Sequence, residues 1–142
     1  MPQRYWISNG GRALETFGAY LPQKPAEHLI SEHSGGCREL ANTAHFHIDL
    51  DGNYLPGLCA GLAIQRDDLG SPLSTEKYPL LSRLYAGGIG ALFRYATNEF
   101  GFVPAAGYAL KCHLCYDIRH FLALGEDRRF EELQPEGHYL YG

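Results

Sequence analysis

The sequence of 142 residues predicts an α+β fold, and three observations lead to this prediction. Alternating apolar and polar side chains around an Asp-Gly pair in residues 44–58 indicate a short antiparallel hairpin. Apolar side chains at helical spacing indicate helices over residues 78–99 and from about 115 to 124. The third observation is a set of cysteines that lie far apart in the sequence, namely Cys37, Cys59, Cys112 and Cys115. We therefore expect a single domain over residues 1–142, in which a small hairpin or antiparallel sheet and two to three helices surround a four-cysteine metal site.

The segment before Cys37 gives weaker local signals than the rest of the chain. Residues 4–8 have the pattern of a short strand, and the Asn-Gly-Gly that follows would end it. Apolar side chains at helical spacing predict a short helix over residues 12–20. Two prolines and a Gly-Gly pair in residues 22–36 predict a loop that leads into Cys37.

The hairpin is the clearest local prediction. Phe46, Ile48 and Leu50 alternate with polar neighbours, which indicates a half-buried strand. Gly52 suits the turn because glycine tolerates a positive φ. The return strand should be short or at an edge, since Pro56 cannot donate a hydrogen bond.

The segment 78–99 is the strongest helix prediction. Pro79 fits only in a first turn, Ser74 or Thr75 could cap the helix, and Gly101 is placed to end it. The pair Gly87-Gly88 predicts either a break in the helix or the close approach of another backbone. The side chains expected in the core are Leu81, Leu84, Ile89, Leu92 and Phe93.

The C-terminal third should contain one more helix. Residues 102–111 are expected to be irregular or extended, and the following helix should begin near Cys115 and run to about Leu124. Residues 125–142 are charged and then aromatic, so we expect a tail that either docks or frays beside a core of residues 37–124.

Composition excludes several classes of function. The formal net charge of −4 argues against a nucleic-acid partner, which needs a basic face. No apolar run is long enough to span a membrane, and residues 1–20 lack the apolar core of a signal peptide. The expected location is therefore the cytoplasm, where structural disulfides are rare.

The cysteines have the spacing of a metal site. Cys112 and Cys115 form a C-x-x-C pair, which can place both sulfurs on the same side of one ion or cluster. A helix N-terminus near Cys115 would favour the thiolate form. One shared site with Cys37 and Cys59 is the main prediction. In the other interpretations only the C-x-x-C pair matters, or disulfides form; the spacing itself does not decide between zinc and an iron–sulfur cluster.

The order of these residues resembles the SPASM/twitch domains that follow the catalytic barrel of many radical S-adenosylmethionine (SAM) enzymes. In that family a cysteine precedes a hairpin with a glycine in its turn, and a second cysteine, a helix and a C-x-x-C follow. Here the same order is Cys37, Gly52, Cys59, the helix at about 80–99, and Cys112 with Cys115. The phrases HFHIDLDGNYLPGLCAGLAI and KCHLCYDIRHFL are also similar to the C-terminal region of radical SAM relatives. The resemblance covers roughly residues 37–124 and implies that the four cysteines ligate an auxiliary [4Fe–4S] cluster.

The chain also departs from that family. The gap between Gly52 and Cys59 is slightly longer than usual, and the C-x-x-x-C-x-x-C triplet that binds the catalytic SAM cluster is missing. The resemblance therefore implies an accessory domain or a fragment, whose cluster carries electrons or positions substrate for a radical SAM barrel in the same or a partner chain. The alternative is a zinc-binding structural or interaction domain without a redox role, and purification in air could also place zinc at these thiolates.

Other polar residues give weaker indications. His45, His47 and Asp49 share one strand face, where they could face a substrate, hold a metal in a small independent enzyme, or simply meet solvent. His113 is expected to be a loop residue that donates a hydrogen bond. The remaining charges are expected on the surface or against a partner domain, and they include Asp67, Asp68, Arg119, Arg128, Arg129, Glu131 and Glu132.

Overall fold

The computed structural model describes residues 12–126 and 130–140, and it has a mixed α+β fold. The strand predicted at residues 4–8 lies outside the described residues. The elements, in chain order, are α1 (Arg12–Phe17), the 3₁₀ helix η1 (Gly18–Tyr20), α2 (Ala26–Glu32), α3 (Arg38–Ala41), β1 (Phe46–Ile48), β2 (Tyr54–Pro56), the 3₁₀ helix η2 (Arg66–Asp68), α4 (Pro79–Phe100), α5 (Lys111–Ala123) and α6 (Gly137–Leu140).

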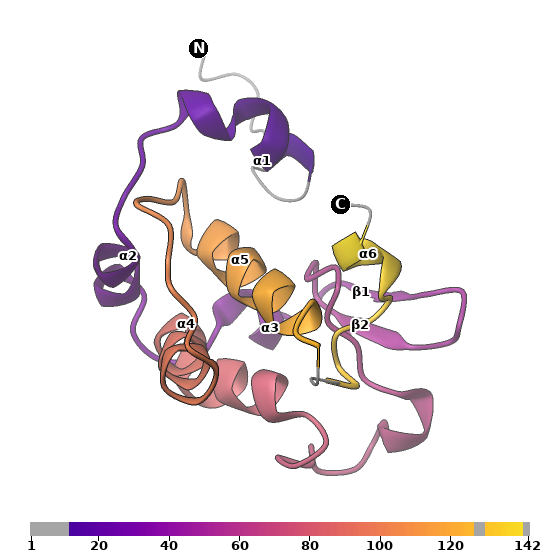
Figure 1. Cartoon of the computed structure of the whole chain (residues 1–142). Helices are drawn as coiled ribbons and strands as arrows, with labels where there is room; N and C mark the ends of the chain where they lie inside the picture. The colour runs from indigo at the N-terminus through magenta and orange to yellow at the C-terminus, as the bar shows by residue number, and fades with distance from the viewer. Residues whose placement is uncertain (1–11, 127–129, 141–142) are drawn as a thin grey trace.

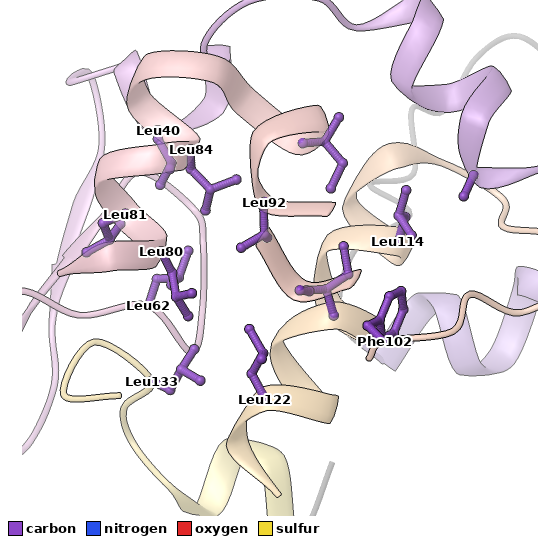
Figure 2. Close-up of a cluster of buried hydrophobic side chains, with 14 of the residues drawn as sticks. Leu40, Leu62, Leu80, Leu81, Leu84, Leu92, Phe102, Leu114, Leu122 and Leu133 are labelled. Carbon is purple, nitrogen blue, oxygen red and sulfur yellow. The ribbon is translucent and has the colours of Figure 1, made fainter. Parts of the chain in front are cut away.

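Helices α4 and α5 form the centre of the fold. Figure 1 shows α5 in the middle of the molecule, with α4 beside it and the β1–β2 hairpin and α6 at one end. Figure 2 shows leucines from both helices pointing into the space between them. The buried residues drawn there and labelled include Leu80, Leu81, Leu84 and Leu92 of α4 and Leu114 and Leu122 of α5.

The structure confirms most of what the sequence predicts for α4. Leu81, Leu84, Ile89 and Leu92 are buried, while Phe93 is only partly buried against the same core. Gly101 ends the helix in the left-handed conformation, with a φ of 71°. The helix is interrupted at Gly88, whose φ of 63° is not helical.

The predicted cap of α4 was wrong. Tyr78 occupies the N-cap position and makes no side-chain cap hydrogen bond, while the Ser74 hydroxyl accepts from the N–H of Lys77, which lies before the helix. The first free N–H groups of the helix instead meet the Glu132 carboxylate, which accepts from Leu80 at 2.9 Å and from Leu81 at 2.8 Å. Glu132 is fully buried, so its expected place on the surface was also wrong.

The hairpin is confirmed, but the predicted burial of its first strand was wrong. β1 and β2 pair antiparallel, with Ile48 opposite Tyr54, and Gly52 lies in the turn with a φ of 82°. Phe46 and Ile48 are 57% and 55% exposed. The alternation of apolar and polar side chains therefore predicts the strand correctly, but it does not mean that one face of the strand is buried.

Two further boundaries differ from the expectation. A helix, α2, occupies residues 26–32, where we expected a loop. Helix α5 begins at Lys111, so the C-x-x-C pair lies within its first turns instead of before it. Leu133 and Tyr139 of the C-terminal tail are buried, so of the two arrangements expected for the tail this part docks on the core. Among the described helices, none is both long enough and apolar enough to cross a membrane.

Candidate metal centre

Close backbone contact between two glycine pairs positions Cys37. A Cβ atom added to Gly88 would lie 2.2 Å from the carbonyl oxygen of Gly35, and one added to Gly36 would lie 2.2 Å from that of Tyr85. The N–H of Cys37 then donates to the Leu84 carbonyl at 2.8 Å. The segment before Cys37 is therefore held directly against the kinked middle of α4, because neither glycine pair carries side chains that would separate the backbones.

An acidic and a basic side chain connect Cys37 to α5. The Cys37 thiol donates to Glu39 Oε2 at 3.4 Å, and the same carboxylate oxygen forms an ion pair with Lys111. Lys111 is the first residue of α5 and directly precedes Cys112. This chain of contacts brings the Cys37 segment to the start of the helix that carries Cys112 and Cys115.

Cys59 lies in a turn just after the hairpin. Its N–H donates to the Pro56 carbonyl at 3.2 Å, and its own carbonyl accepts from Leu62 at 3.2 Å. Gly57, with a φ of 59°, passes so near α3 that an added Cβ would lie 2.6 Å from the Glu39 carbonyl oxygen. The turn therefore packs next to the segment that carries Cys37.

The thiols are close enough to influence one another's ionisation. Burial raises the pKa of Cys59 to about 12; Arg119 opposes this shift, while Cys115, Cys37 and Cys112 add to it. Loss of water around the sulfur raises the pKa of Cys112 to about 11, with a further contribution from Cys115. Burial also raises the pKa of Cys37. The cysteines therefore gather in one region of the fold from three distant segments of the chain.

The structure does not show a formed metal site. Within residues 12–126 and 130–140, no group of three or more His, Cys, Asp or Glu side chains is arranged to hold a metal ion. All four cysteines are free thiols. The four-cysteine site is thus still a prediction, although its residues share a neighbourhood.

Arg119 is a buried neighbour of the thiols, and its expected place on the surface was wrong. Only 7% of this residue is exposed. Its Nη1 donates to the Ala60 carbonyl at 2.8 Å and to the Tyr139 hydroxyl at 2.9 Å. Burial disfavours its charge, but Tyr139, Cys115 and Cys59 more than offset this, so the pKa of Arg119 lies above its usual value. One local signal pointed to it, namely its position one helical turn after Cys115.

The histidine residues named from the sequence have other surroundings. His45 and His47 are exposed, and the Asp49 carboxylate is engaged in the hairpin turn, where it accepts from the N–H groups of Asp51 and Asn53. His113 lies on α5 and accepts a 3.3 Å hydrogen bond from the Ala109 N–H, so both the loop position and the donor role expected for it were wrong. A substrate-facing role of His45, His47 and Asp49 is still only a prediction.

Comparison with known proteins adds no identification. No protein family, curated protein or solved structure matches this chain.

Proposed function

We propose that Cys37, Cys59, Cys112 and Cys115 together ligate one metal centre, and that this centre is an auxiliary [4Fe–4S] cluster of the twitch type. The observation that carries the proposal is the position of Cys59 and Cys115 beside the buried guanidinium of Arg119, with Cys37 and Cys112 close enough to influence the ionisation of Cys59. The resemblance to SPASM/twitch domains supports the choice of cluster.

The four cysteines and Arg119 fit a metal centre in their charge as well as in the type of donor atom. A buried cation is costly unless it is paired, and the groups that favour the charge of Arg119 are Tyr139, Cys115 and Cys59 rather than a carboxylate. Four thiolates carry more negative charge than Zn²⁺ or a [4Fe–4S]²⁺ core neutralises, so the loaded centre would be a net anion. Arg119 would then have a counter-charge in its own surroundings.

The direction of the thiol pKa shifts also fits a ligand role better than a nucleophilic one. Reactive cysteines have lowered pKa values, whereas the pKa values of Cys37, Cys59 and Cys112 are raised. A metal would replace the thiol protons as it binds, so its affinity should fall as the pH falls. When bound, such a cluster supplies one-electron transfer or a fixed point for positioning a substrate.

The chain would act as an accessory domain beside a radical SAM barrel in the same or a partner chain. The resemblance supports this role, and the missing cysteine triplet assigns the SAM-binding cluster to that barrel. A zinc-binding structural domain is the alternative, because the same four thiolates suit zinc.

Anaerobic preparation of the full chain tests the proposal. The protein would be purified without oxygen, reconstituted with ferrous iron and sulfide, and assayed for iron, sulfide and zinc alongside the absorption spectrum and the electron paramagnetic resonance (EPR) spectrum after reduction. We expect four irons and four sulfides per chain, as a [4Fe–4S] cluster requires. One zinc per chain and no stable iron would support the structural alternative, and no bound metal would contradict both.

A further inference from the structure

A polar link lies between the cysteine region and the C-terminal helix. The buried Arg119 joins the Ala60 carbonyl, next to Cys59, to the Tyr139 hydroxyl of α6. That hydroxyl in turn donates to the Gly61 carbonyl at 2.5 Å. Arg119 therefore fixes the turn that carries Cys59 against α5 and α6.

One donor of Arg119 is not used by this link. Its Nε is buried and has no hydrogen-bond partner among the described residues. The guanidinium also interacts with the Cys115 thiol, one helical turn earlier on α5. Leaving a buried donor without a hydrogen-bond partner destabilises the folded protein, and the loss of free energy is larger for a charged group than for a neutral one. The positive charge thus lies beside two of the predicted ligands, Cys59 and Cys115, and the same guanidinium has one N–H without a partner.

We propose that Arg119 is a positioning residue for the metal centre: it neutralises part of the negative charge of the thiolates and donates a hydrogen bond to a ligand sulfur. This inference rests on the proposed four-cysteine centre and deepens it. Hydrogen bonds to the sulfurs and nearby charge are among the factors that set the potential of an iron–sulfur cluster. A nearby cation favours the more negative, reduced form, so Arg119 should raise the midpoint potential.

Charge-removing and charge-retaining variants separate this role from a purely structural one. Arg119→Gln, Arg119→Lys and the exposed control Arg66→Gln would be reconstituted anaerobically with iron and sulfide. The readouts are iron content, thermal unfolding of the metal-free protein and the midpoint potential from an EPR-monitored titration. Arg66 has a side chain that is 79% exposed, so its variant lowers the net charge equally without touching the cysteines.

We expect Arg119→Gln to lower the equilibrium constant for one-electron reduction at least tenfold, which corresponds to about −59 mV. Arg119→Lys keeps the charge, so its midpoint potential should fall by less than half as much as that of Arg119→Gln. Arg66→Gln should not change the midpoint potential measurably. An unchanged potential in a fully loaded Arg119→Gln protein would overturn the inference and leave the proposed function intact.

Zinc provides a second readout if the glutamine variant does not hold a cluster. The affinity of each metal-free protein for zinc would be measured in competition with a chelator. We expect Arg119→Gln to bind zinc at least tenfold more weakly than the wild type, while Arg119→Lys stays within threefold. Equal affinities for Arg119→Gln and the wild type, or equal losses for Arg119→Gln and Arg119→Lys, would contradict the role of the charge. A wild-type chain that binds neither iron nor zinc would instead overturn the proposed function.

Discussion

Glu132 and Leu80 are 52 positions apart in the sequence, and the Leu80 N–H donates to Glu132 Oε1 at 2.9 Å. The second oxygen accepts from Leu81 at 2.8 Å, so one carboxylate satisfies two of the free donors at the start of α4. Burial nevertheless raises the pKa of Glu132 to about 7, against the two backbone donors, which lower it. A carboxyl group with a raised pKa in the folded protein makes stability depend on pH.

We predict that the free energy of unfolding falls as the pH rises through the window set by Glu132. The folded protein holds the proton up to a pKa of about 7, whereas the ordinary value is 4.5, so the folded state is favoured by protonation. The contribution is complete below about pH 4.5 and is lost by about pH 7, and its size is on the order of 3 kcal/mol. Urea unfolding of the metal-free protein at a series of pH values measures it.

The variant Glu132→Gln isolates this effect. It should lose the pH dependence within that window and also about 1–3 kcal/mol of stability, because its amide nitrogen cannot accept from a backbone N–H. Glu131→Gln, at the exposed neighbouring position, is the matched control. A pH profile for Glu132→Gln that parallels the wild type would show that another group causes the dependence.

We predict that the contact between the two glycine pairs stabilises both the fold and the cysteine region. Gly88→Ala adds a methyl group 2.2 Å from the Gly35 carbonyl oxygen at a φ of 63°, so it should cost more than 3 kcal/mol. Gly101→Ala has a φ of 71° with nothing within 4 Å, and it should cost only about 1–2 kcal/mol.

Urea unfolding and metal content distinguish the two glycine variants. Because the Gly88 contact positions the Cys37 segment, Gly88→Ala should also bind less metal, while Gly101→Ala should bind as much as the wild type. Equal costs for the two variants would mean that backbone strain alone, and not the contact with Gly35, accounts for the effect.

We predict that β1 contributes little to stability through its side chains. Ile48 is 55% exposed, so Ile48→Ala should cost less than about 1 kcal/mol. Leu92 of α4 is fully buried in the core, so Leu92→Ala should cost about 2–5 kcal/mol. Thermal unfolding compares them, and a larger loss for Ile48→Ala would indicate that this strand face is covered in solution.

Local patterns in the sequence were sufficient for the main elements. The alternation around Gly52 and the helical spacing from Leu81 to Leu92 each depend on neighbours within a few residues, and the structure confirms both. Helix α2 was missed because two prolines precede it and most of its residues are polar, so its short buried face, Ala26 and Leu29, gave little periodic signal.

Burial of charged side chains could not be read from local patterns. Glu132 and Arg119 both have charged or polar neighbours in the sequence, yet each is buried by partners from remote segments. The sequence predicted a break in the helix or the close approach of another backbone at Gly87-Gly88, and both occur. Local patterns could not show that the approaching backbone is that of Gly35. The order of the cysteines suggested a shared region, but their charged surroundings emerged only from the fold.

The most direct test of the central claim is the metal content of four single variants, Cys37→Ser, Cys59→Ser, Cys112→Ser and Cys115→Ser. Each would be prepared anaerobically beside the wild type and assayed for bound iron, sulfide and zinc, together with thermal unfolding. If the four thiolates share one centre, every variant should hold markedly less metal than the wild type and lose the stabilisation that the metal provides. A variant that keeps the full metal content and an unchanged unfolding curve, Cys37→Ser or Cys59→Ser above all, would contradict a single four-cysteine centre.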